Sequence, residues 1–220
     1  MNRPRRFDLI VFDWDGTLYD STAMIARCIQ SACADLKLPV PSVQDASYVI
    51  GMGLSEALQH AAPGLPPERY PELGARYRHH YAARQNDLSL FDGTLPMLHA
   101  LKERQHLLGI ATGKTRRGLD DVLHTVQLKG LFDATRTADE TRSKPHPQML
   151  QELMAEVGVD PERTLMIGDT THDLQMAQLA GVPRVGVSYG AHEPASFASY
   201  TPLQVVHSMA ELDAWLAQSA

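Results

Sequence analysis

The amino-acid sequence predicts an α/β protein: a Rossmann-like parallel sheet with helices on both faces and an inserted small helical lid. Short apolar runs alternate with segments of helical periodicity, which is typical of βαβ units and a parallel sheet. A block of helical periodicity over residues 21–85 interrupts this alternation directly after the first apolar run. We therefore expect a core formed by residues 1–20 and 86–220 and a helical domain formed by residues 21–85.

Composition and charge argue against several classes of protein. The 220 residues are 44% hydrophobic and 21% charged, and the net charge is −6 with dispersed basic residues. This pattern does not indicate a nucleic-acid partner, and no apolar stretch is long enough to span a bilayer. The cysteines, Cys28 and Cys33, support neither a disulfide framework nor a zinc site. We expect a cytoplasmic protein, monomeric or homodimeric, with neither nucleic acid nor a membrane as partner.

The first strand is expected at residues 9–12, where four apolar residues follow one another. An unbroken short apolar run is typical of a strand buried on both faces. The next segment changes to helical spacing, with Ile25, Ile29 and Leu36 on one face. Ser21 is a candidate helix cap, and the prolines that begin at Pro39 end the helix.

Two more helical stretches complete the insertion. One covers residues 43–61 and is broken or bent near Gly51 and Gly53. The other carries Tyr77 and Tyr81 four residues apart, so both lie on one helix face. We attribute this tyrosine stripe to packing rather than to ligand binding.

Beyond the insertion, helices and strands alternate. Helices are expected at residues 95–103, 115–124, 147–157 and 173–180. Strands are expected at residues 107–112, 164–168 and 184–188, with one more within 132–138.

Two carboxylates, Asp13 and Asp15, stand where the first strand ends. Side chains alternate along a strand, so both carboxylates leave on the same side, about 7 Å apart at Cα. Like charges this close repel, and a shared proton or a metal ion must offset them. The Gly16 that follows lets the chain turn sharply.

Further polar residues follow the other expected strands. In open α/β sheets, ligands bind beyond the carboxyl ends of the strands, so these residues are expected to converge in one crevice. They are Thr112, Gly113 and Lys114 after the second strand, Lys144 after the third, and Asp169 and Asp173 after the fourth.

This set of residues suits magnesium-assisted phosphoryl transfer. Mg²⁺ prefers oxygen ligands, which Asp13, Asp15 and Asp169 supply. Thr112 offers a hydroxyl, Gly113 an open backbone amide and Lys144 a positive charge, all suited to a phosphate group. The chain has no Gly-rich loop ending in Gly-Lys-Ser/Thr, so it is not a P-loop nucleotide-binding protein.

Four motifs in this order resemble those of the haloacid dehalogenase superfamily. They are DWDGTLYDS from Asp13, the threonine of ATGK, the lysine of SKPHP and GDTTHD from Gly168. The resemblance covers essentially the whole chain, and the helical insertion lies where that family has its small helical cap. The pattern is most similar to the phosphoglycolate phosphatase-like members.

The resemblance implies a role for each matching residue. Asp13 would be the nucleophile that becomes an aspartyl phosphate, and Asp15 would be the general acid and base. Thr112 and Lys144 would hold the phosphoryl oxygens. Asp13, Asp169 and the backbone carbonyl of Asp15 would bind Mg²⁺, and Asp173 would be an outer-shell (second-shell) or alternative ligand. The substrate would be a small phosphorylated metabolite.

Some residues have an alternative interpretation. Many relatives have Asn or Ser where this chain has Gly113, so one side-chain hydrogen bond is missing. Thr170 and Asp173 have the spacing of a capping box, which is compatible with metal support. Lys114 stands near a helix N-terminus, where a cation is unfavourable, and we attribute it to a solvated face rather than to a ligand contact. His146 and His172 alone do not form a metal site, so we expect them to support neighbours or face solvent.

Several functions are compatible with the motifs. The leading one is a Mg²⁺-dependent phosphatase acting on a small phosphate monoester. A sugar phosphomutase would share all four motifs, and a binding module without turnover is the alternative from another class. A dehalogenase would lack the second acid, Asp15, and a phosphonatase would need a lysine in the insertion, where Lys37 is the only one.

Overall fold

The computed structural model describes residues 5–220 of the chain. Its strands form one parallel sheet in the order β3-β2-β1-β4-β5-β6, so β1 lies at the centre. The strands are β1 Leu9–Phe12, β2 Leu107–Thr112, β3 Ala134–Thr137, β4 Thr164–Gly168, β5 Arg184–Val187 and β6 Gln204–Val206.

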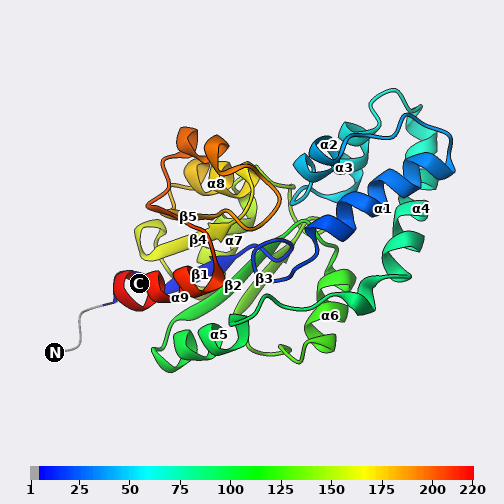
Figure 1. The fold of residues 1–220 in the computed structure, drawn as a ribbon. Helices are drawn as coiled ribbons and strands as arrows, with labels where there is room; N and C mark the ends of the chain where they lie inside the picture. The colour runs from blue at the N-terminus through cyan, green and yellow to red at the C-terminus, as the bar shows by residue number, and fades with distance from the viewer. Residues whose placement is uncertain (1–4) are drawn as a thin grey trace.

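The helices flank this sheet or belong to the insertion (Figure 1). They are α1 Thr22–Asp35, α2 Val43–Tyr48, α3 Leu54–Ala61, α4 Tyr70–Ala82, α5 Thr94–Glu103, α6 Arg116–Thr125, α7 Gln148–Val157, α8 Thr171–Leu179 and α9 Met209–Ser219.

The alternation of side chains along β1 creates two hydrophobic cores. Ile10 and Phe12 pack with residues of α5, α6 and α9 on one face of the sheet. Leu9 and Val11 pack with residues of α7 and α8 on the other. All four side chains are fully buried, which explains why the strand is an unbroken apolar run. The predicted α/β sheet with helices on both faces is confirmed.

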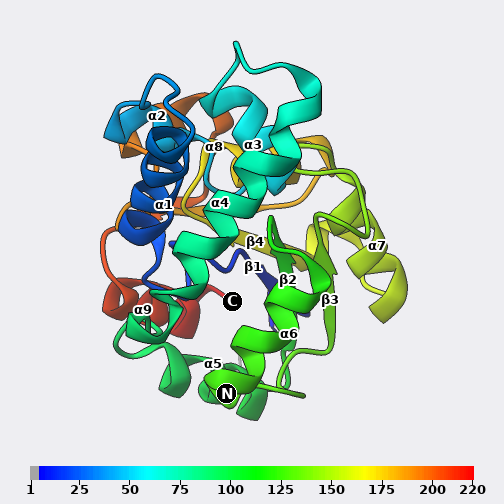
Figure 2. The same cartoon turned by 90° about the vertical axis from the view of Figure 1, so that its right-hand side faces the viewer.

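The insertion forms a helical cap between β1 and β2, and α1 and α4 run side by side in it (Figure 2). Its apolar residues form two clusters of their own, one around Ile25 and Ile29 and the other around Leu58 and Leu73. An inserted helical cap was expected, and it is confirmed. The division of the chain at residues 21 and 85 stays a prediction.

Most element boundaries agree with the sequence pattern to within two residues, and the bend near Gly51 and Gly53 separates α2 from α3. The pattern does not identify β6 and α9. The strand β6 has three residues and lies at the edge of the sheet, too short for a periodic signal. The helix α9 does begin with a recognisable signal, because the Ser208 hydroxyl accepts a hydrogen bond from the Glu211 amide.

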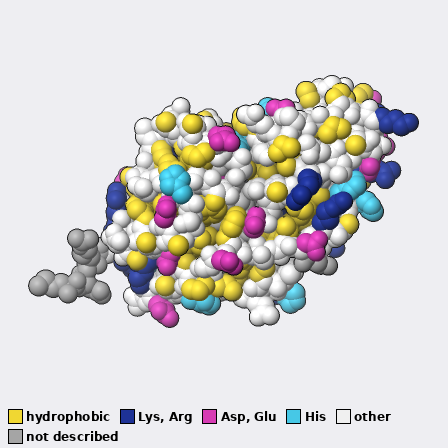
Figure 3. Space-filling model, viewed as in Figure 1, with side chains coloured by type: hydrophobic (Ala, Val, Ile, Leu, Met, Phe, Trp, Pro, Cys, Tyr) yellow, Lys and Arg dark blue, Asp and Glu magenta, His cyan; other side chains and the backbone are white. Residues whose placement is uncertain are grey.

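The surface, the helices and the cysteines add three observations. On the face shown in Figure 3, acidic side chains are scattered over the surface, and the basic ones lie mainly toward its two ends. Within residues 5–220, no helix combines the length and the apolar character needed to cross a membrane. Cys28 and Cys33 are buried and free.

Candidate active site

The carboxyl ends of β1 and β4 bring three acids together. Asp13 directly follows β1, and its amide donates to the Ile167 carbonyl of β4 at 2.9 Å. Asp169 directly follows β4, and Asp173 lies in the first turn of α8. The three side chains are buried, and each offers a carboxylate oxygen within 4.8 Å of the others. The sequence prediction that Asp13 and Asp169 converge is met in this geometry.

Lys144 supplies the positive charge of this cluster. Its ammonium lies 2.7 Å from Asp13 Oδ1 and 2.7 Å from Asp173 Oδ1, and its side chain is fully buried. Burial alone would lower the pKa of Lys144, but the charges of Asp13 and Asp173 outweigh it and raise this pKa. The lysine is therefore a fixed cation that bridges two of the acids.

One lysine does not neutralise three carboxylates. Burial raises the pKa of Asp13 well above its ordinary value, and the neighbouring charge of Asp173 adds to this. Burial and the same Asp173 charge raise the pKa of Asp169 to about 7. The cluster therefore holds protons that a carboxylate in water would lose, unless another cation takes their place.

The acids fit a divalent metal ion such as Mg²⁺. Mg²⁺ takes oxygen ligands and is bound by few carboxylates together with water and phosphate. Within residues 5–220, Asp13 Oδ2 is buried and has no hydrogen-bonding partner, so it has an oxygen to offer. A bound cation would also relieve the repulsion that raises the pKa values of Asp13 and Asp169.

Asp169 and Asp173 differ in how much of each carboxylate is already used. Asp169 accepts one hydrogen bond at each oxygen, from the Thr17 hydroxyl and the Ala191 amide, both at 2.8 Å. Asp173 Oδ1 accepts a hydrogen bond from the Lys144 ammonium, and Asp173 Oδ2 accepts from the hydroxyl and the amide of Thr170. Thr170 and Asp173 form the expected capping box. This double use of Asp173 supports a second-shell position for it, which stays a prediction.

Gly16 is required for the close approach of Asp169 to the strand end. Its φ is +84°, in the left-handed region, and a Cβ at this position would lie 2.2 Å from Asp169 Oδ2. An L-residue would therefore displace the carboxylate. The glycine that sequence analysis assigned to a turn also makes room for the acid.

Asp15 lies apart from the three-acid cluster and has partners of its own. Its Oδ1 accepts a 2.6 Å hydrogen bond from the Ser21 hydroxyl and lies 3.0 Å from the Lys114 ammonium. Ser21 stands at the N-terminus of α1, but its side chain makes no cap hydrogen bond because it is engaged with Asp15. Its expected role as a side-chain cap is therefore wrong.

Lys114 does not lie on a solvated face, contrary to expectation. Its ammonium also donates to the Tyr81 hydroxyl at 3.0 Å and stands 5.0 Å from the centre of that ring. The lysine thus joins Asp15 of the core to α4 of the cap. The unfavourable position of this cation near a helix N-terminus was the sequence signal of the contact. Tyr81, which sequence analysis attributed to packing, therefore also belongs to the site.

Thr112 and Gly113 lie at the end of β2, facing the cap. Thr112 is fully buried, and its hydroxyl accepts from the Lys114 amide at 3.2 Å. A Cβ at Gly113 would lie 2.3 Å from the carbonyl oxygen of Met52 and 2.7 Å from that of Gly51. The cap loop between α2 and α3 therefore occupies the space of a side chain, which accounts for glycine at this position.

Buried histidines of the core hold the cap in place. His172 Nε2 and His192 Nε2 both donate to the Tyr48 carbonyl at the end of α2, at 2.8 and 2.9 Å. Burial lowers the pKa of His172 to about 4, and it also lowers that of His192. Both rings are thus neutral donors near pH 7. Sequence analysis did not single out His192, which lies outside the motifs.

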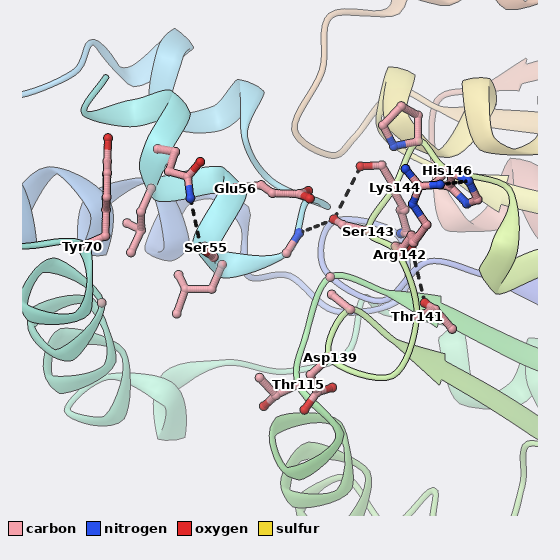
Figure 4. A pocket seen from close by; sticks show the side chains of 18 of the residues that line it. Ser55, Glu56, Tyr70, Thr115, Asp139, Thr141, Arg142, Ser143, Lys144 and His146 are labelled. Atoms are coloured by element: carbon pink, nitrogen blue, oxygen red, sulfur yellow. Dashed lines mark hydrogen bonds between the residues drawn. The ribbon is translucent and has the colours of Figure 1, made fainter. Parts of the chain in front are cut away.

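Within residues 5–220, cavities lie between the cap and the core, and two of them border the site. The outer cleft, about 1410 Å³, lies between α3 and the loop that carries Arg142 and Lys144 (Figure 4). The Gly53 amide donates to the Ser143 hydroxyl across it at 2.7 Å. His146, at the same loop, contacts Arg142 at 3.0 Å. The second cavity, about 440 Å³, is reached by Asp15, and we call it the Asp15 chamber.

Known proteins resemble this chain over most of its length. The model of a family described as haloacid dehalogenase-like hydrolase matches residues 10–187. The chain is 31% identical to a probable phosphatase, IndB, of Dickeya dadantii, over 93% of this chain and 91% of that protein. It is 30% identical to a phosphoglycolate phosphatase of Mannheimia succiniciproducens, over 94% of this chain and 97% of that protein. The crystal structure of a predicted phosphoglycolate phosphatase from Haemophilus somnus matches with a TM-score of 0.82 and 27% identity, over 94% of this chain and 96% of that one.

Proposed function

This chain belongs to the haloacid dehalogenase-like hydrolase family, and we propose that it is a Mg²⁺-dependent phosphatase that hydrolyses a small, phosphoglycolate-like phosphate monoester. The observation that carries the proposal is the buried cluster of Asp13, Asp169 and Asp173 with one bridging cation, Lys144. Relatives that are about as long as this chain are named phosphatases, which supports the same reaction class.

In the first step, an oxygen of Asp13 attacks phosphorus. The bond between phosphorus and the ester oxygen breaks, and Asp15 gives its proton to that oxygen. Lys144 holds Asp13 Oδ1 at 2.7 Å, which fixes the orientation of the nucleophile. The product of this step is an aspartyl phosphate on Asp13 and a free alcohol. Acid–base assistance of this kind typically contributes about 10²–10⁴-fold to the rate.

In the second step, Asp15 takes a proton from water. The oxygen of this water attacks phosphorus, the bond from phosphorus to Asp13 breaks, and inorganic phosphate leaves. Ser21 and Lys114 hold one oxygen of Asp15 in place for both steps. The same carboxyl thus acts first as acid and then as base.

Phosphate and metal binding complete the site. Thr112, the Gly113 amide and Lys144 bind the phosphoryl oxygens. Asp13, Asp169 and the Asp15 carbonyl bind Mg²⁺, with Asp173 in the second shell. Bound Mg²⁺ supplies positive charge that stabilises the developing charge on the phosphoryl group. The partner is a small phosphorylated metabolite, and we propose a cytoplasmic monomer or homodimer with no membrane or nucleic-acid partner.

The test is release of inorganic phosphate from p-nitrophenyl phosphate and from a panel of phosphometabolites that includes phosphoglycolate. We expect turnover with Mg²⁺, none with EDTA, and a loss of about 10⁴-fold or more in Asp13→Asn, because the nucleophile is gone. The matched control is Asp213→Asn, an exposed aspartate on α9, which should keep wild-type activity. Equal rates in Asp13→Asn and the wild type would refute the nucleophile.

Two other outcomes would favour the alternative functions. Conversion of a free hexose 1-phosphate to the 6-phosphate, without release of phosphate, would indicate a phosphomutase. Binding of phosphometabolites without turnover of any of them would indicate a binding module.

A further inference from the structure

The Asp15 chamber is the space into which the alcohol part of a substrate would extend. Of the two cavities, only this one is lined by Asp15. The acid must lie within hydrogen-bond reach of the ester oxygen that it protonates. The carbon atoms bonded to that oxygen therefore begin beside Asp15 and continue into the chamber.

Most of the buried wall of this chamber is aliphatic. The side chains come from α1, from the end of α2 and from α3, and each is at most 7% exposed. They are Ile25, Ile29, Val49, Ile50 and Ala57. Such a surface offers no hydrogen bonds to a polar group, and burying an unpaired polar group there is costly.

The charged groups of the chamber are either engaged or at its edge. Lys114, next to Asp15, is already paired with that carboxylate and with the Tyr81 hydroxyl. Arg117 and Asp121 have side chains that are 92% and 71% exposed, and they lie 3.9 Å from each other. Arg78 also lines the chamber, is exposed and takes part in none of the ion pairs of the described residues. The buried wall of the chamber therefore offers no unengaged cation for a carboxylate such as that of glycolate, and Arg78 and Arg117 belong to its exposed part.

The size of the chamber also exceeds what a two-carbon acid needs. At about 440 Å³ it falls within the range of about 300–1,000 Å³ that is typical of pockets for drug-sized ligands. A ligand that leaves most of an apolar cavity unfilled loses the contacts that stabilise larger ones.

We infer that the alcohol released by this enzyme has an apolar body, branched aliphatic or aromatic, that fills the Asp15 chamber. The inference rests on the proposed phosphatase reaction, and it replaces the phosphoglycolate-like substrate of that proposal by an ester of a larger, apolar alcohol. The aliphatic wall selects the body of the alcohol, and the exposed charges at the edge are within reach only of its far end.

The test compares esters that differ in the alcohol but not in its reactivity. Ethyl, 3-methylbutyl and 2-phenylethyl phosphates are all esters of unactivated primary alcohols, so differences in kcat/KM report the fit in the chamber. We expect kcat/KM at least about 10-fold higher for the two larger esters than for ethyl phosphate, because methylene groups that fill an apolar pocket are worth about 10-fold or more. 2-Phosphoglycolate, the anionic comparator, should also fall below them.

Neighbouring alanines at the end of α4 provide a variant and its control. Ala82 lines the chamber and Ala83 does not, and both are exposed. In Ala82→Trp, the indole should partly fill the chamber and reduce the preference for the larger esters from about 10-fold to about 2-fold. Ala83→Trp should keep the wild-type preference.

Binding of non-hydrolysable analogues separates the two proposals. Calorimetry with ethylphosphonate and 2-phenylethylphosphonate, in Mg²⁺, should show the same preference of about 10-fold for the larger compound. If ethyl phosphate or 2-phosphoglycolate is hydrolysed as well as the larger esters, the inference is overturned and the phosphatase stands. If no ester is hydrolysed, the proposed function fails, and equal dissociation constants of the phosphonates then overturn the apolar chamber too.

Discussion

The core side of the cleft holds three carboxylates and a lysine in a fully buried cluster, whereas the cap side presents mainly aliphatic side chains and backbone carbonyls. Each charged group on the core side has a partner at hydrogen-bond distance, such as Lys144 with Asp13 and Asp173. On the cap side, direct polar contacts to the core are few, and they use the carbonyl of Tyr48, the amide of Gly53 and the hydroxyl of Tyr81.

This difference separates chemistry from selectivity. Charges on the core side must be placed accurately, because buried like charges repel and each needs its counter-charge. Apolar walls on the cap side select by shape and area, which many combinations of side chains can supply. Changes in the core are therefore expected to alter the reaction itself, and changes in the cap to alter which substrate reacts.

After loss of the nucleophile, the largest effect on the core side is expected for Asp15→Asn, which keeps the shape of the side chain and removes the acid. Both steps should slow, so kcat falls about 10²–10⁴-fold. Because hydrolysis of the aspartyl phosphate lacks a base, this intermediate should accumulate during turnover and be detected after rapid quenching. The measurement is the rate of phosphate release from an ester of an unactivated alcohol, such as 2-phenylethyl phosphate, together with intact-mass detection of the phosphoenzyme. Normal decay of the phosphoenzyme would count against this role of Asp15.

Stability should show a similar contrast between buried and surface charges. Lys144→Met leaves the buried carboxylates without their lysine, and breaking a buried ion pair costs about 3–5 kcal/mol. Lys102→Met breaks a pair with Asp133 at 2.8 Å near the surface, which should cost about 1 kcal/mol or less. The free energy of unfolding from urea titrations in EDTA measures both. Equal losses in the two variants would argue against Lys144 as the counter-charge of the cluster.

Removal of the metal should matter more at higher pH. The raised pKa values of Asp13 and Asp169 mean that the folded protein binds protons more tightly than the unfolded chain. Stability of the metal-free protein should therefore fall as pH rises from about 4 to about 7. Mg²⁺ replaces these protons, so its stabilising effect should grow over the same range, to about 2.7 kcal/mol at 100 times its Kd.

The measurement is the melting temperature with Mg²⁺ and with EDTA, at pH 5.5 and pH 7.5. We expect the difference between Mg²⁺ and EDTA to be larger at pH 7.5 and to shrink in Asp169→Asn, which removes one ligand. A larger difference at pH 5.5 would show that protons and the metal ion do not compete for these carboxylates.

The sequence alone predicted the site residues that directly follow the end of an apolar strand. The runs that became β1, β2 and β4 have their ends defined by the change from apolar to polar residues, and parallel pairing then brings Asp13, Thr112 and Asp169 to one edge. The capping box of Thr170 and Asp173 was also predictable, because it depends only on local spacing.

Contacts between the cap and the core were not predictable in the same way. The pairing of Lys114 with Asp15 and Tyr81, and that of Tyr48 with His192, join segments far apart in the chain. No periodicity fixes how the insertion is rotated against the sheet, so the inward face of each cap helix is set by packing. The glycine at position 113 was visible as a departure, but its reason lies in the cap loop.

The smallest effect is expected where the core touches the cap loop, for Gly113→Ala. A Cβ at this position would lie 2.3 Å from the Met52 carbonyl oxygen, which is backbone, so the cap loop must move away. Overpacking of this kind costs about 1–3 kcal/mol. If the cost falls only on the arrangement in which the cap loop contacts Gly113, kcat/KM drops by about 5–150-fold, while the overall free energy of unfolding changes less.

Gly64→Ala is the control for this prediction, because it lies in the cap with no atom within 4 Å of the added Cβ. Its kcat/KM should equal that of the wild type. In Gly113→Ala the substrate preference should change, because the displaced loop forms part of the Asp15 chamber. Asp13 should still become phosphorylated. A variant that keeps its preference but loses the phosphoenzyme would show that Gly113 acts through the chemistry of the core.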